Sequence, residues 1–125
     1  MKIIKSIIAL SILFVACNTA VSQDKQPITE FELENRSGAP LIDVRTPEEF
    51  AAGHLPNAQN IDVFDEDFRK GFSKFDKNAP LYVYCRSGNR SAKAQSILKE
   101  MGFVKVINLE GGFMAWESAG KSVEK

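Results

Sequence analysis

Residues 81–91 read Leu81-Tyr82-Val83-Tyr84-Cys85-Arg86-Ser87-Gly88-Asn89-Arg90-Ser91. The first four side chains form a continuous apolar run, which is typical of a strand that helices cover on both faces of a parallel sheet. A helix is predicted from Ser91 onward, because apolar residues then recur on one helix face, at Ala94, Ile97, Leu98 and Met101. Gly102 and Phe103 suit the end of that helix. Cys85 is therefore expected at the carboxyl end of a buried strand.

Short strands and helices alternate on either side of this unit. Further strands are predicted over 41–44, 60–62 and 104–109. Short helices are predicted to begin at Pro47, Asp65 and Phe113. Four phenylalanines recur at near-helical spacing and are predicted to lie in the core, namely Phe64, Phe68, Phe72 and Phe75. This alternation predicts one α/β domain with a central parallel sheet flanked by helices.

The first residues have the pattern of a secretory signal. Lys2 and Lys5 precede an apolar run over 7–17, and small and polar residues follow. The run is too short to cross a bilayer, which needs about 20 residues. We expect a signal peptide over 1–22 and a periplasmic or secreted protein. The alternative is a lipoprotein signal over 1–16, with Cys17 lipidated and the protein anchored in the bacterial envelope.

The remaining chain divides into a polar tether over 23–27, a domain over 28–119 and a charged tail over 120–125. Ile28 opens the domain and suggests a short entry strand. A chain of 125 residues is enough for one domain and excludes a two-domain enzyme.

Composition excludes several classes of function. The 16 basic residues are balanced by 16 acidic ones, so no basic field exists to hold a nucleic acid. Two cysteines and one histidine cannot supply the usual ligands of a zinc site, and no metal or other cofactor is expected. A membrane partner is expected only if Cys17 is lipidated.

The loop after the buried strand combines features that favour a thiolate. Open α/β sheets place ligands at this edge. Gly88 and Asn89 tolerate positive φ, which lets the backbone curl so that its N–H groups point inward and form a nest for an anion. The next helix adds its positive end, and Arg86 and Arg90 add two charges. We predict that Cys85 is nucleophilic and faces an anion, whereas the alternative is an inert buried thiol.

Other cysteine chemistries fit less well. A Cys-x-x-Cys redox motif is excluded because position 88 is glycine. His54 is the only histidine and lies in a Gly-His-Leu-Pro turn, where an orienting role is expected rather than that of a catalytic base. Tyrosine-phosphatase loops have the pattern Cys-x5-Arg, but here Ser91 occupies that place and Arg90 comes one residue early.

The six-residue loop resembles that of the rhodanese (sulfurtransferase) family. Three further segments resemble landmarks of that family in the same order, namely Leu41-Ile42-Asp43-Val44-Arg45-Thr46-Pro47-Glu48-Glu49-Phe50, Gly53-His54-Leu55-Pro56-Asn57-Ala58 and Glu110-Gly111-Gly112 leading to Ala115-Trp116. One departure is Asn57, where the family often has glycine. Asparagine also adopts the left-handed conformation, so little consequence is expected.

This resemblance implies a rhodanese-like fold and a thiosulfate sulfurtransferase. Cys85 would take a sulfur from a small anionic donor such as thiosulfate, and pass the resulting persulfide sulfur to a thiol or to cyanide. The substrate would be bound by the rest of the loop, namely Arg86, Ser87, Gly88, Asn89 and Arg90. Asp43 and Arg45 would brace the site, and Trp116 would lie in the core. The alternatives are a sulfur carrier with little turnover and a small phosphatase or arsenate reductase.

Overall fold

The computed structural model describes residues 24–125 as one α/β domain. Its strands are β1 (Lys25–Pro27), β2 (Leu41–Asp43), β3 (Gln59–Asn60), β4 (Leu81–Tyr84) and β5 (Val106–Glu110). Its helices are the 3-10 helices η2 (Ile28–Glu30) and η3 (Leu33–Arg36), and the α-helices α1 (Pro47–Ala52), α2 (Phe68–Gly71), α3 (Asn89–Glu100) and α4 (Gly112–Ser118). The expectation of an α/β domain is confirmed.

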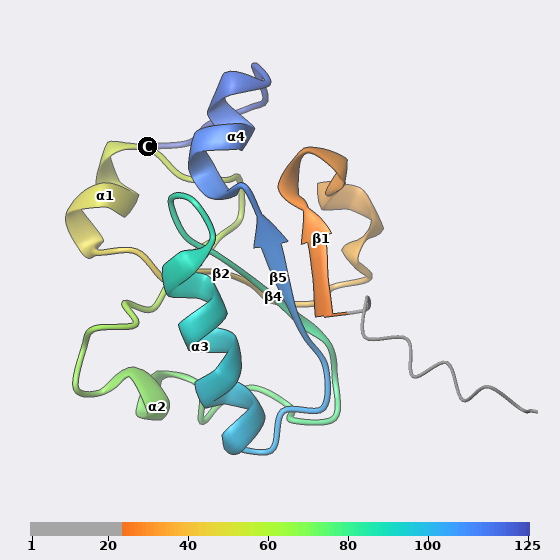
Figure 1. Cartoon of the computed structure of the whole chain (residues 1–125), viewed down its shortest axis with the longest axis vertical. Coiled ribbons are helices and arrows are strands. Elements are labelled where there is room, and N and C mark those ends of the chain that lie inside the picture. The colour runs from red at the N-terminus through yellow and green to blue at the C-terminus, as the bar shows by residue number, and fades with distance from the viewer. Residues whose placement is uncertain (1–23) are drawn as a thin grey trace, which may run out of the picture.

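All five strands are parallel and form one sheet in the order β1-β5-β4-β2-β3 (Figure 1). The carboxyl ends of the strands therefore meet at one edge. In Figure 1 this edge is uppermost, with α1 and α4 beside the loop that joins β4 to α3. A ligand site in an open α/β sheet is expected at this edge.

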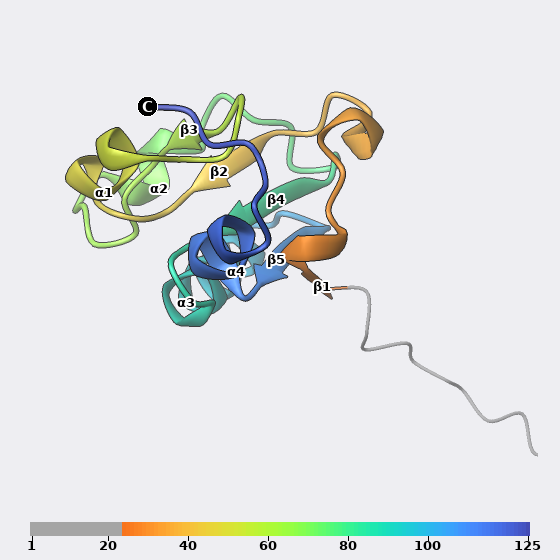
Figure 2. The same ribbon diagram turned by 90° about the horizontal axis from the view of Figure 1, so that it is seen from above.

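Alternate residues of the strands belong to two separate hydrophobic cores, because successive side chains of a strand point to opposite faces of the sheet. On one face, Val83 and Cys85 pack with residues of α3 such as Leu98. On the other face, Tyr84 packs with Trp116 and with the segment that follows β1. Figure 2, a view from above, shows α2 and α3 on the same side of the sheet, the side of the Val83 core. Cys85 therefore belongs to the face that α3 covers.

The ends of α1 and α3 follow the sequence signals. Thr46 accepts the N–H of Glu49, whose side chain accepts the N–H of Thr46, so the predicted capping box is present. At the end of α3, the N–H of Gly102 binds the carbonyl of Lys99 and the N–H of Phe103 binds that of Leu98. This is a Schellman motif, which needs glycine because Gly102 has a φ of 98°.

The segment expected to be a tether is different in the structure. Lys25–Pro27 form the edge strand β1, in register with Asn108 to Glu110 of β5. Polar side chains did not indicate a strand, but an edge strand requires only backbone pairing on one side and tolerates proline at its end. The entry strand therefore precedes Ile28, which is buried in η2. Gln23 and the expected signal over 1–22 lie outside the described residues.

The predicted phenylalanine stripe is only partly in the core. Phe68 and Phe72 are buried, and Phe75 packs against them. Phe64 is 62% exposed and lies near Lys93 instead. The prediction was wrong for Phe64 because α2 has only four residues, so that Phe64 lies in the preceding turn and not on a helix face.

The last residues are exposed but attached to the domain. The backbones of His54 and Glu124 pair in an antiparallel bridge, and the indole N–H of Trp116 donates to the carbonyl of Ser122 at 2.8 Å. Within residues 24–125, the helices all fall short of the length and apolar character that crossing a membrane requires.

Candidate active site

Cys85 follows β4 directly, and its sulfur is enclosed by the loop that leads into α3. The N–H of Gly88 donates to Sγ at 3.0 Å, and the hydroxyl of Ser91 donates at 3.3 Å. The side chain is only 1% exposed, although Arg86, Ser87 and Asn89 of the same loop are exposed. The sulfur therefore lies at the base of the loop, inside a ring of hydrogen-bond donors.

These donors decide the ionisation of Cys85. Burial raises the pKa of the thiol, but hydrogen bonds from the Ser91 hydroxyl and from the N–H groups of Ser91, Gly88 and Ser87 lower it by more. The net pKa of Cys85 is below its ordinary value, because these groups stabilise the charged form of the sulfur. A thiolate is the nucleophilic form of cysteine.

Gly88 is the centre of the loop. Its φ is 118°, which favours glycine, and this conformation turns its N–H toward the sulfur. Its carbonyl accepts three donors, the hydroxyl of Ser91 at 3.1 Å, the N–H of Ala92 at 3.1 Å and the side-chain amide of Asn108 at 3.3 Å. Asn89 does not have the positive φ that was expected, since it is already the first residue of α3.

The two loop arginines have different surroundings. Arg90 donates to both carboxylate oxygens of Glu49, at 2.6 and 2.9 Å, so its charge is already neutralised. This bidentate pair lowers the pKa of Glu49 to about 2. Among the ion pairs of the described residues Arg86 has none, and its side chain is exposed. Arg86 is thus the loop arginine whose charge is free to meet an anion.

Asp43, at the end of β2, and Arg45, two residues after it, support the site without a hydrogen bond to the sulfur. Arg45 forms a buried bidentate pair with the carboxylate of Asp43, and also donates to the carbonyl of Gly53 at 2.6 Å. Desolvation alone would lower the pKa of Arg45, but the hydrogen bond and the charge of Asp43 raise it overall. The pair fixes the turn after α1.

His54 takes part in this same support. Its ring stacks on Phe50 with centroids 3.8 Å apart, and Nδ1 lies 3.0 Å from the carbonyl of Phe50. No hydrogen bond joins its ring to Cys85 within residues 24–125. Its surroundings match the orienting role that was expected. Asn57 has a φ of 64°, the left-handed conformation expected of it.

Sequence reasoning missed four residues that build the site. Ser91 was assigned only to the start of a helix, and Glu49 only to a capping box. Asn108 lies between two apolar residues of the predicted strand, and this polar interruption was the available signal. In the structure it is only 7% exposed. Gly112 was noted as a family landmark without a role.

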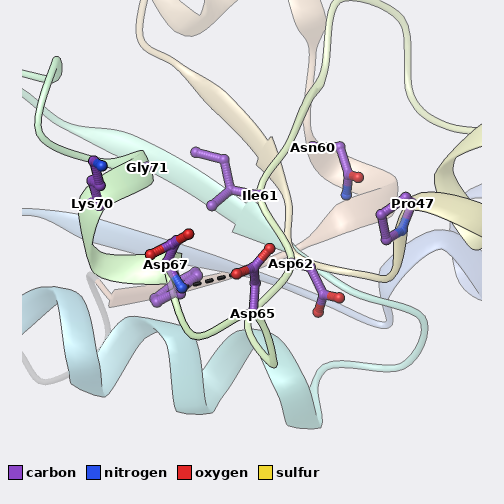
Figure 3. Close-up of a pocket in the computed structure, with 9 residues that line it drawn as sticks. Pro47, Asn60, Ile61, Asp62, Asp65, Asp67, Lys70 and Gly71 are labelled. Carbon is purple, nitrogen blue, oxygen red and sulfur yellow. Dashed lines mark hydrogen bonds between the residues drawn. The ribbon is translucent and has the colours of Figure 1, made fainter.

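Two cavities lie near the carboxyl edge of the sheet. One, of about 350 Å³, lies between α1 and α4 and is lined by Arg86 together with residues of both helices, such as Glu49 and Met114. The other, of about 410 Å³, is shown in Figure 3. It includes Asp62, Asp65, Asp67 and Lys70 but no residue of the Cys85 loop. The cavity beside Arg86 is therefore the one that adjoins the loop of Cys85.

Two acidic side chains of the second cavity, those of Asp62 and Asp65, have a local structural role, because each accepts a backbone N–H two residues further on. In Figure 3, the dashed line marks the hydrogen bond from the N–H of Asp67 to the carboxylate of Asp65, which is 2.8 Å long. Across residues 24–125, no three His, Cys, Asp or Glu side chains are placed to hold a metal ion.

Comparison with known proteins agrees with this architecture. A sequence model described as "Rhodanese-like domain" matches residues 29–119. The uncharacterized protein YqhL of Bacillus subtilis is 40% identical over 99 residues, which are 77% of each chain. The thiosulfate sulfurtransferase GlpE of Pseudomonas putida is 37% identical over 93 residues, covering 74% of this chain and 82% of that protein.

Solved structures are similar in fold. A rhodanese-like domain protein from Staphylococcus aureus superposes with a TM-score of 0.65 and 32% identity, over 82% of this chain and 99% of that one. A rhodanese-related protein from Thermoplasma volcanium gives a TM-score of 0.63 and 31% identity, over 73% of this chain and 88% of that one.

Proposed function

The chain belongs to the rhodanese-like domain family, and from this we propose that it transfers a sulfane sulfur from thiosulfate or a similar anion to a thiol or to cyanide, through a persulfide on Cys85. The observation that carries the proposal is the ring of donors around Sγ. Such a ring holds a negative sulfur without any side-chain base.

The first step forms the persulfide. The Cys85 thiolate attacks the outer sulfur of thiosulfate, a sulfur–sulfur bond forms, and the bond to the sulfite group breaks. Sulfite leaves with the electron pair of that bond, and the negative charge moves to the terminal sulfur on Cys85. Covalent catalysis of this kind divides one transfer into two easier steps.

The second step returns the enzyme to its starting state. A thiolate or cyanide attacks the terminal sulfur, the Cys85 thiolate leaves, and the acceptor carries the sulfur away as a persulfide or as thiocyanate. Both steps leave a negative sulfur on Cys85, so the same donors serve in each. Donors that are already aimed at the charge need no reorganisation during reaction.

The loop residues divide this work. The N–H groups of Ser87 and Gly88 hold the negative sulfur, while exposed Ser87 and Asn89 shape the rim. Arg86 offsets the charge of the incoming donor and the departing sulfite. The sequence also predicted that Arg90 binds substrate. Since Glu49 neutralises Arg90, we now assign Arg90 to holding the loop against α1, with Arg86 as the main contact for the anion.

Release of sulfite from thiosulfate in the presence of cyanide tests the proposal. Cys85→Ser should abolish turnover. Arg86→Gln should raise KM for thiosulfate about tenfold, because the loss of one charge-assisted hydrogen bond costs about 1.5 kcal/mol. Arg69→Gln is the matched control, since Arg69 is also exposed but pairs with Glu100 on α3. Full activity in Cys85→Ser would contradict the mechanism.

The same assay separates the alternatives. A persulfide on Cys85 with negligible steady-state turnover would support a sulfur carrier instead of an enzyme. Hydrolysis of an aryl phosphate faster than the thiosulfate reaction would support a phosphatase.

We also propose that residues 1–22 direct export of the protein, so that the domain acts in the periplasm or outside the cell. The basis is the sequence pattern alone: two lysines, a short apolar run and small residues before Gln23. The intact mass of the protein purified from its native envelope tests this. A chain that begins at Gln23 supports soluble export, acylated Cys17 supports a lipid anchor, and an unprocessed chain contradicts both.

A further inference from the structure

The amino end of α4 is joined to the backbone of the Cys85 loop. The N–H of Phe113 donates to the carbonyl of Cys85 at 2.8 Å, and the N–H of Met114 donates to the carbonyl of Arg86 at 3.1 Å. Figure 1 shows α4 standing beside the loop that connects β4 to α3. The first N–H groups of a helix have no partner within the helix, and here two of them bind successive carbonyls of the loop.

The bond to the carbonyl of Arg86 fixes the direction of the N–H of Ser87. In a planar trans peptide, the C=O and the following N–H point in opposite directions. When Met114 holds the carbonyl of Arg86 on the side of α4, the N–H of Ser87 must point to the other side. That is the side of the sulfur, and the Ser87 N–H is one of the groups that lower the pKa of Cys85. The bond from Phe113 to the carbonyl of Cys85 holds the preceding peptide of the loop in place.

This approach of helix to loop is possible only at a glycine. A Cβ atom at position 112 would lie 2.5 Å from the carbonyl carbon and oxygen of Arg86, and closer still to the carbonyl oxygen of Cys85. Contacts under 3.0 Å essentially never occur for real Cβ atoms, and the atoms met here are backbone, which cannot rotate away. Gly112 also has a φ of 59°, in the left-handed region that favours glycine.

We propose that Gly112 is a positioning residue for the Cys85 sulfur, because it lets the first turn of α4 bind the carbonyls of Cys85 and Arg86 and so aim the N–H of Ser87 at the sulfur. The inference builds on the proposed sulfur transfer, since the same N–H would help to hold the persulfide. Its test is the ionisation of Cys85, which is measured without any sulfur donor and is therefore independent of whether turnover is found.

The first test is Gly112→Ala, with Gly120→Ala as its matched control. Gly120 also has a positive φ, of 72°, but a Cβ there would have no heavy atom within 4 Å, so the control carries the backbone strain without the contact. The thiolate is titrated by its ultraviolet absorbance, and thermal unfolding confirms the fold. We expect the pKa of Cys85 to rise by about one unit in Gly112→Ala, since one charge-assisted hydrogen bond is weakened. Gly120→Ala should titrate as the wild type does.

A second pair keeps the test decisive if Gly112→Ala does not fold. Met114→Pro removes the N–H that binds Arg86, in the first turn of α4 where that N–H has no partner within the helix, and Met114→Ala keeps that N–H. The Met114 side chain is 53% exposed, so neither change disturbs the core. Met114→Pro should raise the pKa of Cys85 by about one unit relative to Met114→Ala. Equal pKa values within the Met114 pair, or a folded Gly112→Ala that titrates as the wild type does, would overturn the proposal.

Discussion

Replacing Ser91 with alanine tests the origin of the thiolate most cleanly. The hydroxyl of Ser91 donates to Sγ of Cys85 at 3.3 Å, and it is the largest of the contributions that lower the thiol pKa. Ser91 is completely buried, and alanine removes only its oxygen atom. The carbonyl of Gly88, which also accepts this hydroxyl, keeps its bonds from Ala92 and Asn108. The loop should therefore keep its shape.

The size of the effect follows from the hydrogen bond. A hydrogen bond to a charged group contributes about 1.5–3 kcal/mol, and one pKa unit corresponds to about 1.36 kcal/mol. The single hydroxyl proton is shared between Sγ and the carbonyl of Gly88, so the lower end of the range applies. Loss of a donor to the charged form raises the pKa. Ser91→Ala should thus raise the pKa of Cys85 by about one unit.

Alkylation by iodoacetamide as a function of pH measures this shift. Below the pKa, the rate is proportional to the thiolate fraction, so Ser91→Ala should react about tenfold more slowly there and approach the wild-type rate at high pH. Ser96→Ala is the control, because Ser96 lies on the same helix, is exposed and bonds only the carbonyl of Ala92. Coincident rate profiles for wild type and Ser91→Ala would refute the claim that this hydroxyl stabilises the thiolate.

Three further changes have defined outcomes. Glu49→Gln should lower the free energy of unfolding by about 1 kcal/mol at neutral pH, measured in urea, since its pair with Arg90 is partly solvated. It should also remove the part of the acid-induced loss of stability that Glu49 contributes as pH falls from about 4.3 toward 2. An identical acid profile in both proteins would contradict the assigned pair. Tyr84→Phe should lower the free energy of unfolding by about 1–3 kcal/mol in the same assay, because it leaves the buried N–H of Leu55, which donates to the phenol oxygen at 3.1 Å, without a partner. An unchanged free energy of unfolding would show that this hydrogen bond makes no net contribution. The pKa of Cys85 is lower in the folded protein than in the unfolded chain. The free energy of unfolding of the wild type should therefore rise relative to that of Cys85→Ser as pH increases from the folded pKa to about 8.5. A difference between the two proteins that does not depend on pH would argue against a stabilised thiolate.

The sequence predicted the elements whose signals are local. The apolar run over 81–84, the capping box at Thr46 and the glycine after α3 each depend on neighbouring residues, and each appears in the structure. β1 was missed because its three residues form a strand only through pairing with β5. The paired residues Lys25 and Asn108 are 108 − 25 = 83 positions apart in the sequence. Phe64 was misplaced because the spacing of the phenylalanines continues beyond the start of a very short helix.

The site shows the same division between local and distant contacts. The position of Cys85 and the curl at Gly88 were predictable, since a strand, a glycine and a helix follow one another there. The partner of Arg90 was not, because Glu49 is 41 residues away and already had a local explanation in its capping box. The sequence predicted that inward-pointing backbone N–H groups and two arginines favour the thiolate; the backbone N–H groups do contact the sulfur, whereas the serine hydroxyl beside it was not predicted.

In the proposed reaction, Cys85 carries the transferred sulfur as a persulfide. Intact mass spectrometry of the purified protein after exposure to thiosulfate, followed by peptide mapping, tests this directly. We predict that the wild type gains the mass of one sulfur atom, located on Cys85, that a thiol acceptor then removes it, and that Cys85→Ser gains none. A wild-type protein that stays unmodified, or a sulfur that maps to another residue, would contradict the account.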